Sequence, residues 1–393
     1  MKHIGVILVG GKGKRLGQIT KKIPKPMVKI NNLPFLDILI YNISQQNFKT
    51  IYLICSYKHD HFFKRYHKKK IFGTDIICIK EKKAKDTGGA IYEIKKKINL
   101  KYFFLFNGDT FFNIDLNNFY KFFSKSKKLI SLAMLKNKNY KSNRKLSSLR
   151  LFKNNVVLSS KKTNIMNGGI YIISKEILKD ITNKKLSFEN FYLPKFIKSS
   201  LVSGKIFNNY FIDIGIKKNL NFAIKTLHKQ ELFKCAFFDR DGVINHDNGY
   251  TYRIKDLKIY RNIPKIINFL NKQKYLVIVV TNQSGIGRGL YSLEQFNKFN
   301  NLIKIKLRAR NAIIDDIFYC PHHPKFAKPI FRKICNCRKP RNGMLLDAIK
   351  KWGINKKKSI MIGDKLTDYM AAKKTKIRFL YFSKNLYKQI KKI

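Results

Sequence analysis

The sequence predicts an α/β protein with two domains, each a sheet of mostly parallel strands covered by helices on both faces. The length of 393 residues suits two domains of roughly 150–230 residues. Short apolar runs rich in β-branched and aromatic residues alternate with longer amphipathic segments, and this alternation occurs twice. Strands that are apolar throughout and separated by helices are typical of parallel sheets buried on both faces.

The elements expected in each half follow from these runs. The strands expected in the first half are Ile4–Val9, Ile51–Cys55, Asp75–Ile79, Phe103–Phe106, Ile130–Leu135 and Gly169–Ile173, with helices over Phe35–Gln45 and Gly89–Ile98. Those expected in the second half are Cys235–Asp239, Leu276–Thr281, Ile317–Tyr319, Ile360–Gly363 and Phe379–Phe382, with helices over Ile263–Gln273, Leu293–Arg308 and Gly343–Trp352. A polar helix tail ends near Thr226–Phe233, so we expect domains at residues 1–230 and 231–393.

The formal net charge of +60 invites a nucleic-acid-binding interpretation, because basic chains bind phosphate backbones by counterion release. However, lysine far outnumbers arginine and is spread along the whole length, and Asn and Ile are also abundant. AT-rich codon usage produces this mixture. We therefore expect no specific nucleic-acid partner. A basic RNA- or membrane-associated scaffold without activity is kept as an alternative, which eroded catalytic motifs would favour.

The chain shows no membrane-spanning pattern, because no uninterrupted apolar stretch approaches the roughly 18–20 residues that a bilayer requires. The apolar run Ile4–Val9 is too short for a signal peptide and leads into a segment rich in glycine and lysine. We expect a cytoplasmic protein without membrane insertion, in which Cys55, Cys78 and Cys235 are buried thiols. The oligomeric state is left open.

In the second half, polar groups follow the apolar strands. Asp239 and Asp241 end the first strand, where one carboxylate can attack phosphorus while its neighbour handles a proton. Thr281 and Asn282 begin a donor-rich turn suited to a phosphoryl group, and Lys339 can supply a fixed positive charge. Two further acids, Asp364 and Asp368, follow a later strand and with Asp239 would make an oxygen site for Mg²⁺.

A cluster of cysteine and histidine interrupts this half. Its four candidate ligands, two pairs separated by a short loop, are Cys320, His322, Cys335 and Cys337. Four such ligands close the tetrahedral shell of a structural Zn²⁺. His323 is adjacent but is expected to point elsewhere on a tight loop. The phosphate chemistry already has its own residues, so the zinc is expected to be structural.

These ordered motifs resemble the haloacid dehalogenase (HAD) phosphatase superfamily over residues 233–383. The resemblance implies that Asp239 is the nucleophile and Asp241 the general acid/base, and that these two with Asp364 and Asp368 lie at the Mg²⁺ site. The zinc loop is similar to that of a branch containing D,D-heptose 1,7-bisphosphate phosphatases and histidinol-phosphate phosphatases. The residues from Asp239 to Asn245, the segment from Thr281 to Gly289 with Arg288, and Arg338 beside Lys339 favour the heptose group and imply substrate contacts. Thr375-Lys376 departs from the Ala-Gly usual before the last HAD strand.

In the first half, a glycine-rich loop with Gly10, Gly11 and Gly13 follows the first strand, and Arg15 can pair with a departing pyrophosphate. A glycine-rich loop of this kind also occurs in dinucleotide-binding folds. Those folds require an acidic residue about 20 residues later, at the end of the second strand. Asp37 lies within an expected helix instead. Lys25 stands on a proline-flanked segment, and Asp109 follows a strand where it can hold Mg²⁺.

The first half therefore resembles the sugar-1-phosphate nucleotidyltransferases over roughly residues 1–225. The resemblance implies that Arg15 and Lys25 bind phosphate, and that Asp109 and Asp213 hold Mg²⁺. It places Thr87 and Gly88 near the base, and Asn167, Gly168 and Glu189 near the sugar. Lys14 stands where the family usually has a small hydroxyl residue. The expected fold is two Rossmann-like three-layer α/β/α domains, a nucleotidyltransferase fold and then a HAD-like fold with a zinc loop.

The two resemblances imply consecutive reactions. A phosphatase that removes the 7-phosphate of a heptose bisphosphate leaves heptose 1-phosphate, which a nucleotidyltransferase can activate. The first half looks most like guanylyltransferases acting on D-glycero-α-D-manno-heptose 1-phosphate. We expect a bifunctional enzyme that makes a GDP-heptose precursor for surface polysaccharide such as lipopolysaccharide. The alternatives are the same chemistries on mannose or glucose 1-phosphate, or a histidinol-phosphate type of phosphatase.

Overall fold

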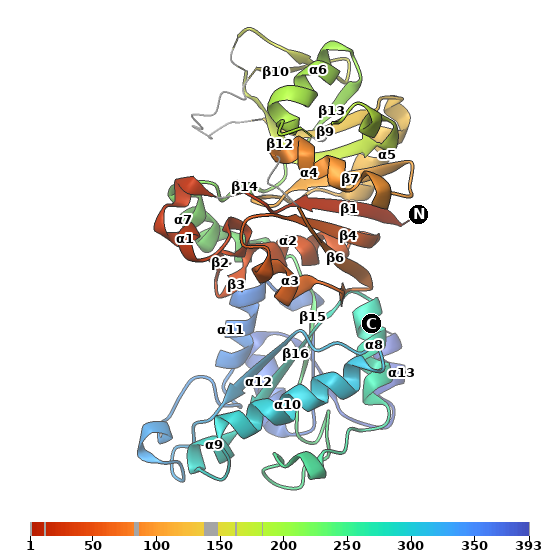
Figure 1. Ribbon diagram of the computed structural model, residues 1–393. Coiled ribbons are helices and arrows are strands. Elements are labelled where there is room, and N and C mark those ends of the chain that lie inside the picture. The colour runs from red at the N-terminus through yellow and green to blue at the C-terminus, as the bar shows by residue number, and fades with distance from the viewer. Residues whose placement is uncertain are drawn as a thin grey trace. The chain divides into compact units, whose positions relative to one another are not determined.

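The computed structural model describes residues 2–11, 13–81, 86–136, 148–161, 163–182 and 184–392, without the side chains of Lys14 and Lys96. The chain forms two compact units, Met1–Lys225 and Thr226–Ile393 (Figure 1). Each unit has its own sheet and its own core. None of the helices in the described part of the chain is both long and apolar enough to cross a bilayer.

The first unit contains a mixed sheet of ten strands in the described residues, in the order β10-β11-β13-β9-β12-β7-β1-β4-β6-β5. Two small sheets pair β14 with β8 and β2 with β3. The strands are β1 (His3–Leu8), β2 (Lys29–Ile30), β3 (Leu33–Pro34), β4 (Phe48–Cys55), β5 (Lys69–Ile71), β6 (Thr74–Lys80), β7 (Tyr102–Asn107), β8 (Thr110–Phe112), β9 (Ile130–Lys136), β10 (Leu149–Phe152), β11 (Asn155–Leu158), β12 (Ile165–Ser174), β13 (Val202–Ile206) and β14 (Phe211–Asp213).

Helices cover both faces of this sheet. They are α1 (Gln18–Lys22), α2 (Phe35–Ser44), α3 (Asp60–Tyr66), α4 (Asp86–Glu93), α5 (Leu116–Ser126), α6 (Leu193–Lys198) and α7 (Lys217–Thr226). Along β7, Phe103 and Leu105 belong to the core cluster that includes α4 and α6. Phe104 points to the opposite face, where its ring lies 6.5 Å from that of Phe119 on α5. Because alternate residues of β7 are buried on both faces, the strand is apolar throughout.

The second unit is built on five parallel strands in the order β17-β16-β15-β18-β19. Its strands are β15 (Cys235–Phe238), β16 (Leu276–Asn282), β17 (Asp316–Cys320), β18 (Ile360–Gly363) and β19 (Arg378–Tyr381). Its helices are α8 (Ile263–Lys272), α9 (Ser284–Arg288), α10 (Leu293–Arg308), α11 (Gly343–Trp352), α12 (Leu366–Thr375) and α13 (Leu386–Lys391). The core between sheet and helices includes Phe238, Val279, Ile267 and Phe299.

The expected strands all occur, with small changes at their ends, and two expectations are wrong. The first sheet is mixed, because β12 runs antiparallel to both β7 and β9. The strand is buried on both sides, so its apolar sequence does not reveal its direction. The expected helix Gly89–Ile98 is instead α4 followed by a short turn at Lys95–Lys97. Cys55, Cys78 and Cys235 are buried, as expected.

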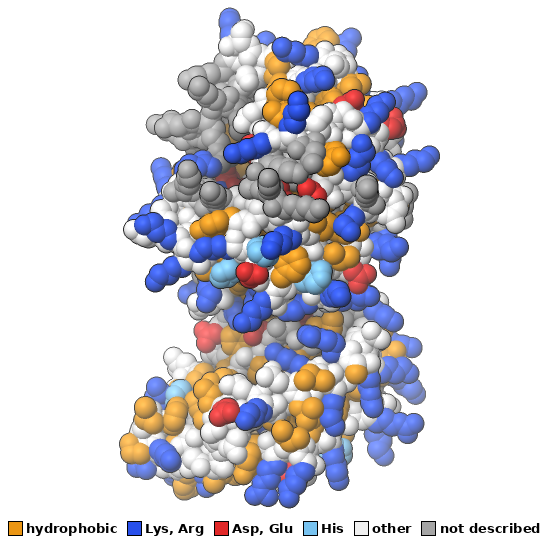
Figure 2. Space-filling model, in the orientation of Figure 1, with side chains coloured by type: hydrophobic (Ala, Val, Ile, Leu, Met, Phe, Trp, Pro, Cys, Tyr) orange, Lys and Arg blue, Asp and Glu red, His pale blue; other side chains and the backbone are white. Residues whose placement is uncertain are grey.

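The surface of the protein is rich in basic side chains, as the high lysine content indicates. Lysine and arginine side chains spread over the whole face in view and do not gather in one patch (Figure 2). The departure at Thr375-Lys376 lies at the end of α12, where Lys376 adopts a left-handed conformation with a φ of 59°. Glycine is favoured at such a helix end, so the substitution affects packing at the end of α12 and not the chemistry at the strand ends.

Candidate active sites

The first candidate site lies at the carboxyl end of the five-stranded sheet. β15 runs directly into Asp239, whose backbone N–H donates to the carbonyl of Ile362 on β18. Lys339 is buried between two carboxylates, with Nζ 2.9 Å from Asp239 Oδ1 and 2.6 Å from Asp368 Oδ1. Three of the predicted residues therefore converge although 129 positions separate the first and last of them.

Three carboxylates of this site can hold one metal ion. Asp239, Asp364 and Asp368 each offer an oxygen, and these oxygens lie within 4.8 Å of one another. One buried oxygen of Asp364 accepts no hydrogen bond within the described residues. Such a set of hard oxygen donors fits Mg²⁺. The carboxylate of Asp241, which the sequence placed at the same metal site, is not part of this group.

The electrostatics of Asp239 follow from its burial. Desolvation raises the pKa of Asp239 to about 7, with Lys339 opposing the shift and Asp368 and Asp241 adding to it. Burial also raises the pKa of Asp364. The neighbouring carboxylates raise the pKa of Lys339 despite its burial, so the ammonium stays charged. A cation bound among these groups would favour the charged, nucleophilic form of Asp239.

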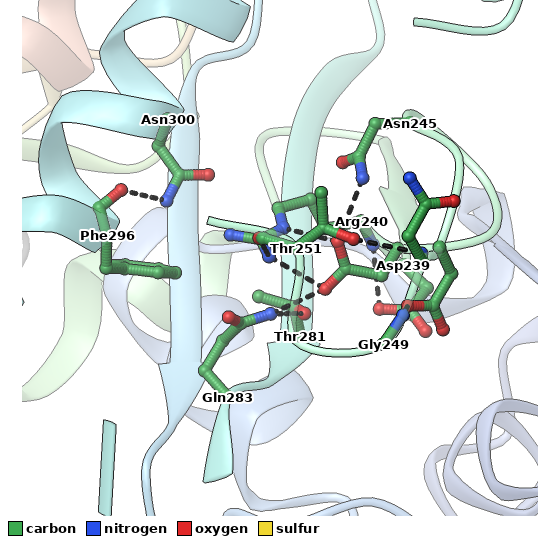
Figure 3. Close-up of polar contacts among 12 residues, drawn as sticks. Asp239, Arg240, Asn245, Gly249, Thr251, Thr281, Gln283, Phe296 and Asn300 are labelled. Carbon is green, nitrogen blue, oxygen red and sulfur yellow. Dashed lines mark hydrogen bonds and ion pairs between the residues drawn. The ribbon is translucent and has the colours of Figure 1, made fainter. Parts of the chain in front are cut away.

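Asp241 is held by a network of donors, and three of these donors, Arg240, Asn245 and Gln283, are labelled in Figure 3. Arg240 donates from Nε at 3.0 Å and from Nη2 at 2.8 Å to the two oxygens of Asp241. Gln283 Nε2 donates to Oδ2 and Asn245 Nδ2 to Oδ1, at 2.8 and 2.9 Å. The guanidinium of Arg240 packs over the rings of Phe296 and Phe299. This arrangement fixes the orientation of a carboxylate two residues from Asp239.

Two residues of β16 form hydrogen bonds with other residues of the site. Thr281 Oγ1 accepts a hydrogen bond of 2.8 Å from Gln283 Nε2. Asn282 exchanges two hydrogen bonds of 3.0 Å with the backbone of Lys339. The sequence analysis gave no site role to Arg240, which lies between Asp239 and Asp241, and Gln283 belongs to the donor-rich turn that follows Thr281.

Two arginines lie at the rim of this site. Arg288, at the end of α9, donates to the hydroxyl of Tyr250, and its guanidinium lies 5.2 Å from that ring and 5.5 Å from the ring of Phe326. Arg338 Nη1 donates to the carbonyl of His322 at 3.1 Å. The structure places both next to the cysteine-rich loop, on which Phe326 and His322 lie.

The cysteine-rich loop gathers the four predicted ligands. Cys320, His322, Cys335 and Cys337 offer atoms that all lie within 4.8 Å of one another. The sulfur of Cys320 is 3.5 Å from that of Cys335 and 3.2 Å from that of Cys337, and His322 Nδ1 is 3.3 Å from Cys337. Tetrahedral Zn–S bonds of about 2.3 Å place ligand atoms about 3.8 Å apart, so the group has nearly the size of a zinc site. The loop thus carries a possible Cys/His metal site.

The second candidate site lies in the first unit, in a cavity of about 1810 Å³. Its wall includes the glycine-rich loop after β1, the ends of β7 and β14, and α7. Lys25 is buried and bridges Asp109, with which it forms a close ion pair, and Asp213, whose Oδ1 lies 3.9 Å from Nζ. Arg15 lies on the same wall. Two acids and two cations thus face one space.

The predicted binding residues of this unit divide into two groups. Gly10, Gly11, Thr87, Asn167 and Glu189 line the cavity. Close packing or backbone conformation requires glycine at the other three positions, and Gly10 also packs closely, because a side chain there would meet Ser56 Oγ at 2.4 Å. A side chain at Gly88 would meet the carbonyl of Leu186 at 2.6 Å, and one at Gly168 would meet Phe112 at 2.6 Å; Gly13 adopts a φ of 64° beside Thr20. The side chain of Lys14 lies outside the described residues.

Glu189 is a half-buried acid on the wall of this cavity. Thr87 Oγ1 donates to Glu189 Oε2 at 2.6 Å and accepts from the backbone N–H of Phe188 at 2.8 Å. Burial raises the pKa of Glu189, which the Thr87 hydrogen bond partly opposes. Asn167 Nδ2 donates to the hydroxyl of Tyr171 at 2.6 Å.

Sequence reasoning missed several cavity-lining residues. Glu81 follows β6 and is buried in the wall, and Lys218 and Lys225 reach the cavity from α7. The strand-end rule that selected Asp109 applies equally to Glu81, so its position was a usable signal. Nothing in the pattern of a lysine-rich chain distinguishes Lys218 and Lys225 from surface lysines.

Comparison with known proteins supports this division. Residues 4–147 match the family model described as nucleotidyl transferase, and residues 234–381 match that described as polynucleotide kinase 3 phosphatase. D-glycero-beta-D-manno-heptose-1,7-bisphosphate 7-phosphatase of Photorhabdus laumondii is 44% identical over 143 residues, covering 36% of this chain and 76% of the relative. The chain belongs to this phosphatase family. The Escherichia coli K12 phosphatase of the same name is 42% identical over 138 residues, covering 35% of this chain and 72% of that protein.

Solved structures are also similar to part of this chain. HddC from Yersinia pseudotuberculosis is 32% identical, covering 57% of this chain and 99% of that protein with a TM-score of 0.49, and it has also been solved complexed with GMP-PN. A putative glucose-1-phosphate thymidylyltransferase from Bacillus anthracis, 17% identical over 57% of this chain and 94% of that protein with a TM-score of 0.51, shows the same fold. The chain therefore joins a domain of this phosphatase family to a segment that matches the nucleotidyl transferase model.

Proposed function

We propose that this chain catalyses two steps of nucleotide-sugar synthesis. Its phosphatase unit hydrolyses the 7-phosphate of D-glycero-D-manno-heptose 1,7-bisphosphate. Its nucleotidyltransferase unit then transfers a nucleotidyl group from GTP to heptose 1-phosphate and releases pyrophosphate. The observation that carries the proposal is the union of the two domains in one chain, because the product of the first reaction is the acceptor of the second. The named substrate of the phosphatase relatives and the GMP-PN complex of HddC support it.

In the phosphatase reaction, Asp239 attacks phosphorus and the bond to the sugar oxygen breaks. Asp241 gives its proton to that leaving oxygen and later takes one from the water that hydrolyses the aspartyl-phosphate. Arg240 and Gln283 hold Asp241 in place for both transfers. Lys339 and the turn at Thr281 receive the phosphoryl group. Mg²⁺ bound by Asp239, Asp364 and Asp368 would neutralise the charge that develops on it.

In the transfer reaction, a phosphate oxygen of the sugar attacks the α-phosphorus of the nucleotide, and the bond to pyrophosphate breaks. Arg15 and Lys25 balance the negative charge of the phosphates. The glycine-rich loop has no side chain at Gly10 or Gly11 on the cavity wall, so its backbone can approach the phosphates closely. Asp109 and Asp213 would hold Mg²⁺, which would polarise the phosphate group under attack.

One experiment can identify the nucleotide, the sugar and the anomer that the protein uses. Each anomer of heptose 1,7-bisphosphate is supplied with Mg²⁺ and with each nucleoside triphosphate in turn, and phosphate, pyrophosphate and nucleotide-sugar are measured. We expect phosphate release from the heptose bisphosphate and pyrophosphate release with GTP. The phosphatase relatives are named for the β-anomer, whereas the sequence favours the α-anomer for transfer. If the protein turned over only mannose or glucose phosphates, or only histidinol phosphate, that compound would replace heptose as the substrate in this proposal.

We further propose that the Cys/His loop binds one structural Zn²⁺ through Cys320, His322, Cys335 and Cys337. Cys337→Ser is expected to lose this metal and to lower the unfolding temperature of the phosphatase unit by roughly 5 °C or more, because binding of structural zinc contributes directly to folding. Metal content by elemental analysis and thermal unfolding check this result. His323→Asn is the matched control and should keep one zinc per chain. Full zinc content in Cys337→Ser would contradict the ligand assignment.

A further inference from the structure

Asp37 is a buried acid that neither proposed reaction uses. It lies in the first turn of α2, and only 3% of it is exposed. Arg65 on α3 donates from Nε to Asp37 Oδ1 at 2.8 Å and forms a second, close ion pair with Oδ2. Tyr66, the last residue of α3, donates its hydroxyl to Oδ1 at 2.5 Å. Burial and the charge of Asp37 raise the pKa of Tyr66, so the phenol keeps the proton that it donates. We call Asp37, Arg65 and Tyr66 the α2–α3 network.

The α2–α3 network contacts the turn that carries Lys25. This turn runs from Lys25 to Met27 and packs against α2. The hydroxyl oxygen of Tyr66 lies 3.5 Å from Met27 Sδ. The backbone joins the same elements, because the N–H of Phe35, at the start of α2, donates to the carbonyl of Val28 at 2.9 Å. The N–H of Val28 in turn donates to the carbonyl of Lys25 at 3.1 Å. Side-chain and backbone contacts therefore hold this turn against α2.

The position of the turn decides where the ammonium of Lys25 lies. In the cavity, Lys25 Nζ forms a close ion pair with Asp109 and lies 3.9 Å from Asp213 Oδ1. A lysine side chain is flexible, so its ammonium stays at one point only while its backbone is fixed. Within the described residues, the cavity wall includes Lys25 but no member of the α2–α3 network. The network therefore acts on the cavity through the turn and not by touching a bound nucleotide.

We infer that the α2–α3 network positions Lys25 for nucleotidyl transfer, with Asp37 as its central positioning residue. The inference rests on the proposed transfer reaction and adds positioning residues to it. A buried ion pair contributes little to stability on balance, because the desolvation of its charges offsets their attraction. It does fix geometry, since three donor groups converge on one carboxylate and the phenol among them contacts Met27. A Lys25 held in this way meets the phosphates without rearranging during the reaction.

Asp37→Asn tests this inference, because the amide keeps the shape of the carboxylate and removes its charge. We expect kcat/KM for GTP in transfer to heptose 1-phosphate to fall about 10-fold or more. The decisive measurement is the same substitution in a Lys25→Met background. If Asp37 acts through Lys25, it should change the remaining kcat/KM there by less than about twofold, because residues that act as a unit are not additive. Pyrophosphate release is measured for all four proteins, with phosphate release by the other unit as the internal reference.

Tyr66→Phe is the milder variant, which keeps the buried ring and the ion pair of the network and removes only the hydroxyl beside Met27. We expect it to lower kcat/KM about 3-fold or more with Lys25 present, and to have no effect in the Lys25→Met background. The matched control is Tyr102→Phe. It removes a buried hydroxyl that is bonded to His3 Nδ1 at 2.9 Å, at the end of β7 away from the cavity, and should keep the wild-type kcat/KM.

Two results would overturn the inference. One is an unchanged kcat/KM in both Asp37→Asn and Tyr66→Phe. The other is an equal fall with and without Lys25, which would assign the network to the fold of the unit as a whole. Failure of the proposed function is distinguishable, because wild-type protein would then form no pyrophosphate from GTP and heptose 1-phosphate. In that case the Kd of GTP with Mg²⁺ is measured for the same proteins. Asp37→Asn should then weaken binding only while Lys25 is present, and equal weakening in both backgrounds, or none, would overturn the inference.

Discussion

Asp239→Asn is expected to lower kcat/KM for phosphate release by at least about 1000-fold, as removal of a catalytic nucleophile does. The amide has nearly the same shape but cannot form the aspartyl-phosphate. Nucleotidyl transfer from supplied heptose 1-phosphate should stay at the wild-type rate, because its residues lie in another unit with its own cavity. Phosphate and pyrophosphate release, measured separately, check both statements.

The fold of this variant should be intact. Burial raises the pKa of Asp239 to about 7, which means that the charged carboxylate is costly in the folded protein. A neutral side chain removes that cost, and Lys339 keeps Asp368 as its partner at 2.6 Å. Asp347→Asn, an exposed change on α11 of the same unit, is the control and should retain full activity. Loss of both activities in a folded Asp239→Asn protein would contradict independent sites.

The sequence predicted the residues of the phosphatase site better than it predicted the other features of the molecule. Asp239, Thr281 and Asp364 each follow an apolar strand, and the carboxyl ends of parallel strands meet at one edge, so their convergence follows from topology. Lys339 was selected only as a source of fixed positive charge, because no strand ends there. The Cys/His pairs also came together as predicted, since a short loop joins them.

Contacts between distant segments were beyond sequence reasoning. The bonds from Gln283 to Asp241 and from Arg240 to the same carboxylate depend on side-chain directions that no spacing encodes. The reversed direction of β12 was hidden because burial on both faces removes the alternation that marks an antiparallel strand. Sequence position also does not distinguish a glycine on a cavity wall, such as Gly11, from one that packs against a neighbouring segment, such as Gly168.

A substitution in the nucleotidyltransferase site should have the opposite effect on the two activities. Asp109→Asn is expected to lower the rate of nucleotidyl transfer at saturating GTP by at least about 100-fold and to leave phosphate release unchanged. The carboxylate pairs with the buried Lys25, and both face the cavity together with Asp213. Removing its charge weakens the proposed Mg²⁺ site and leaves Lys25 with only the longer contact to Asp213 among these acids. Both effects reduce electrostatic stabilisation of the transferring phosphate.

A metal titration distinguishes this cause from general damage. If Asp109 holds Mg²⁺, the variant should need a higher Mg²⁺ concentration for half-maximal transfer, and its thermal unfolding without ligands should resemble that of the wild type. The matched control is Asp75→Asn, which breaks a half-exposed ion pair with Lys70 in the same unit and should change little, because exposed pairs contribute little to stability. A transfer rate that falls with no change in Mg²⁺ dependence would assign Asp109 to the orientation of Lys25 instead. Since the phosphatase has its own carboxylates, unchanged phosphate release in the same protein would show that each unit carries its own metal-dependent chemistry.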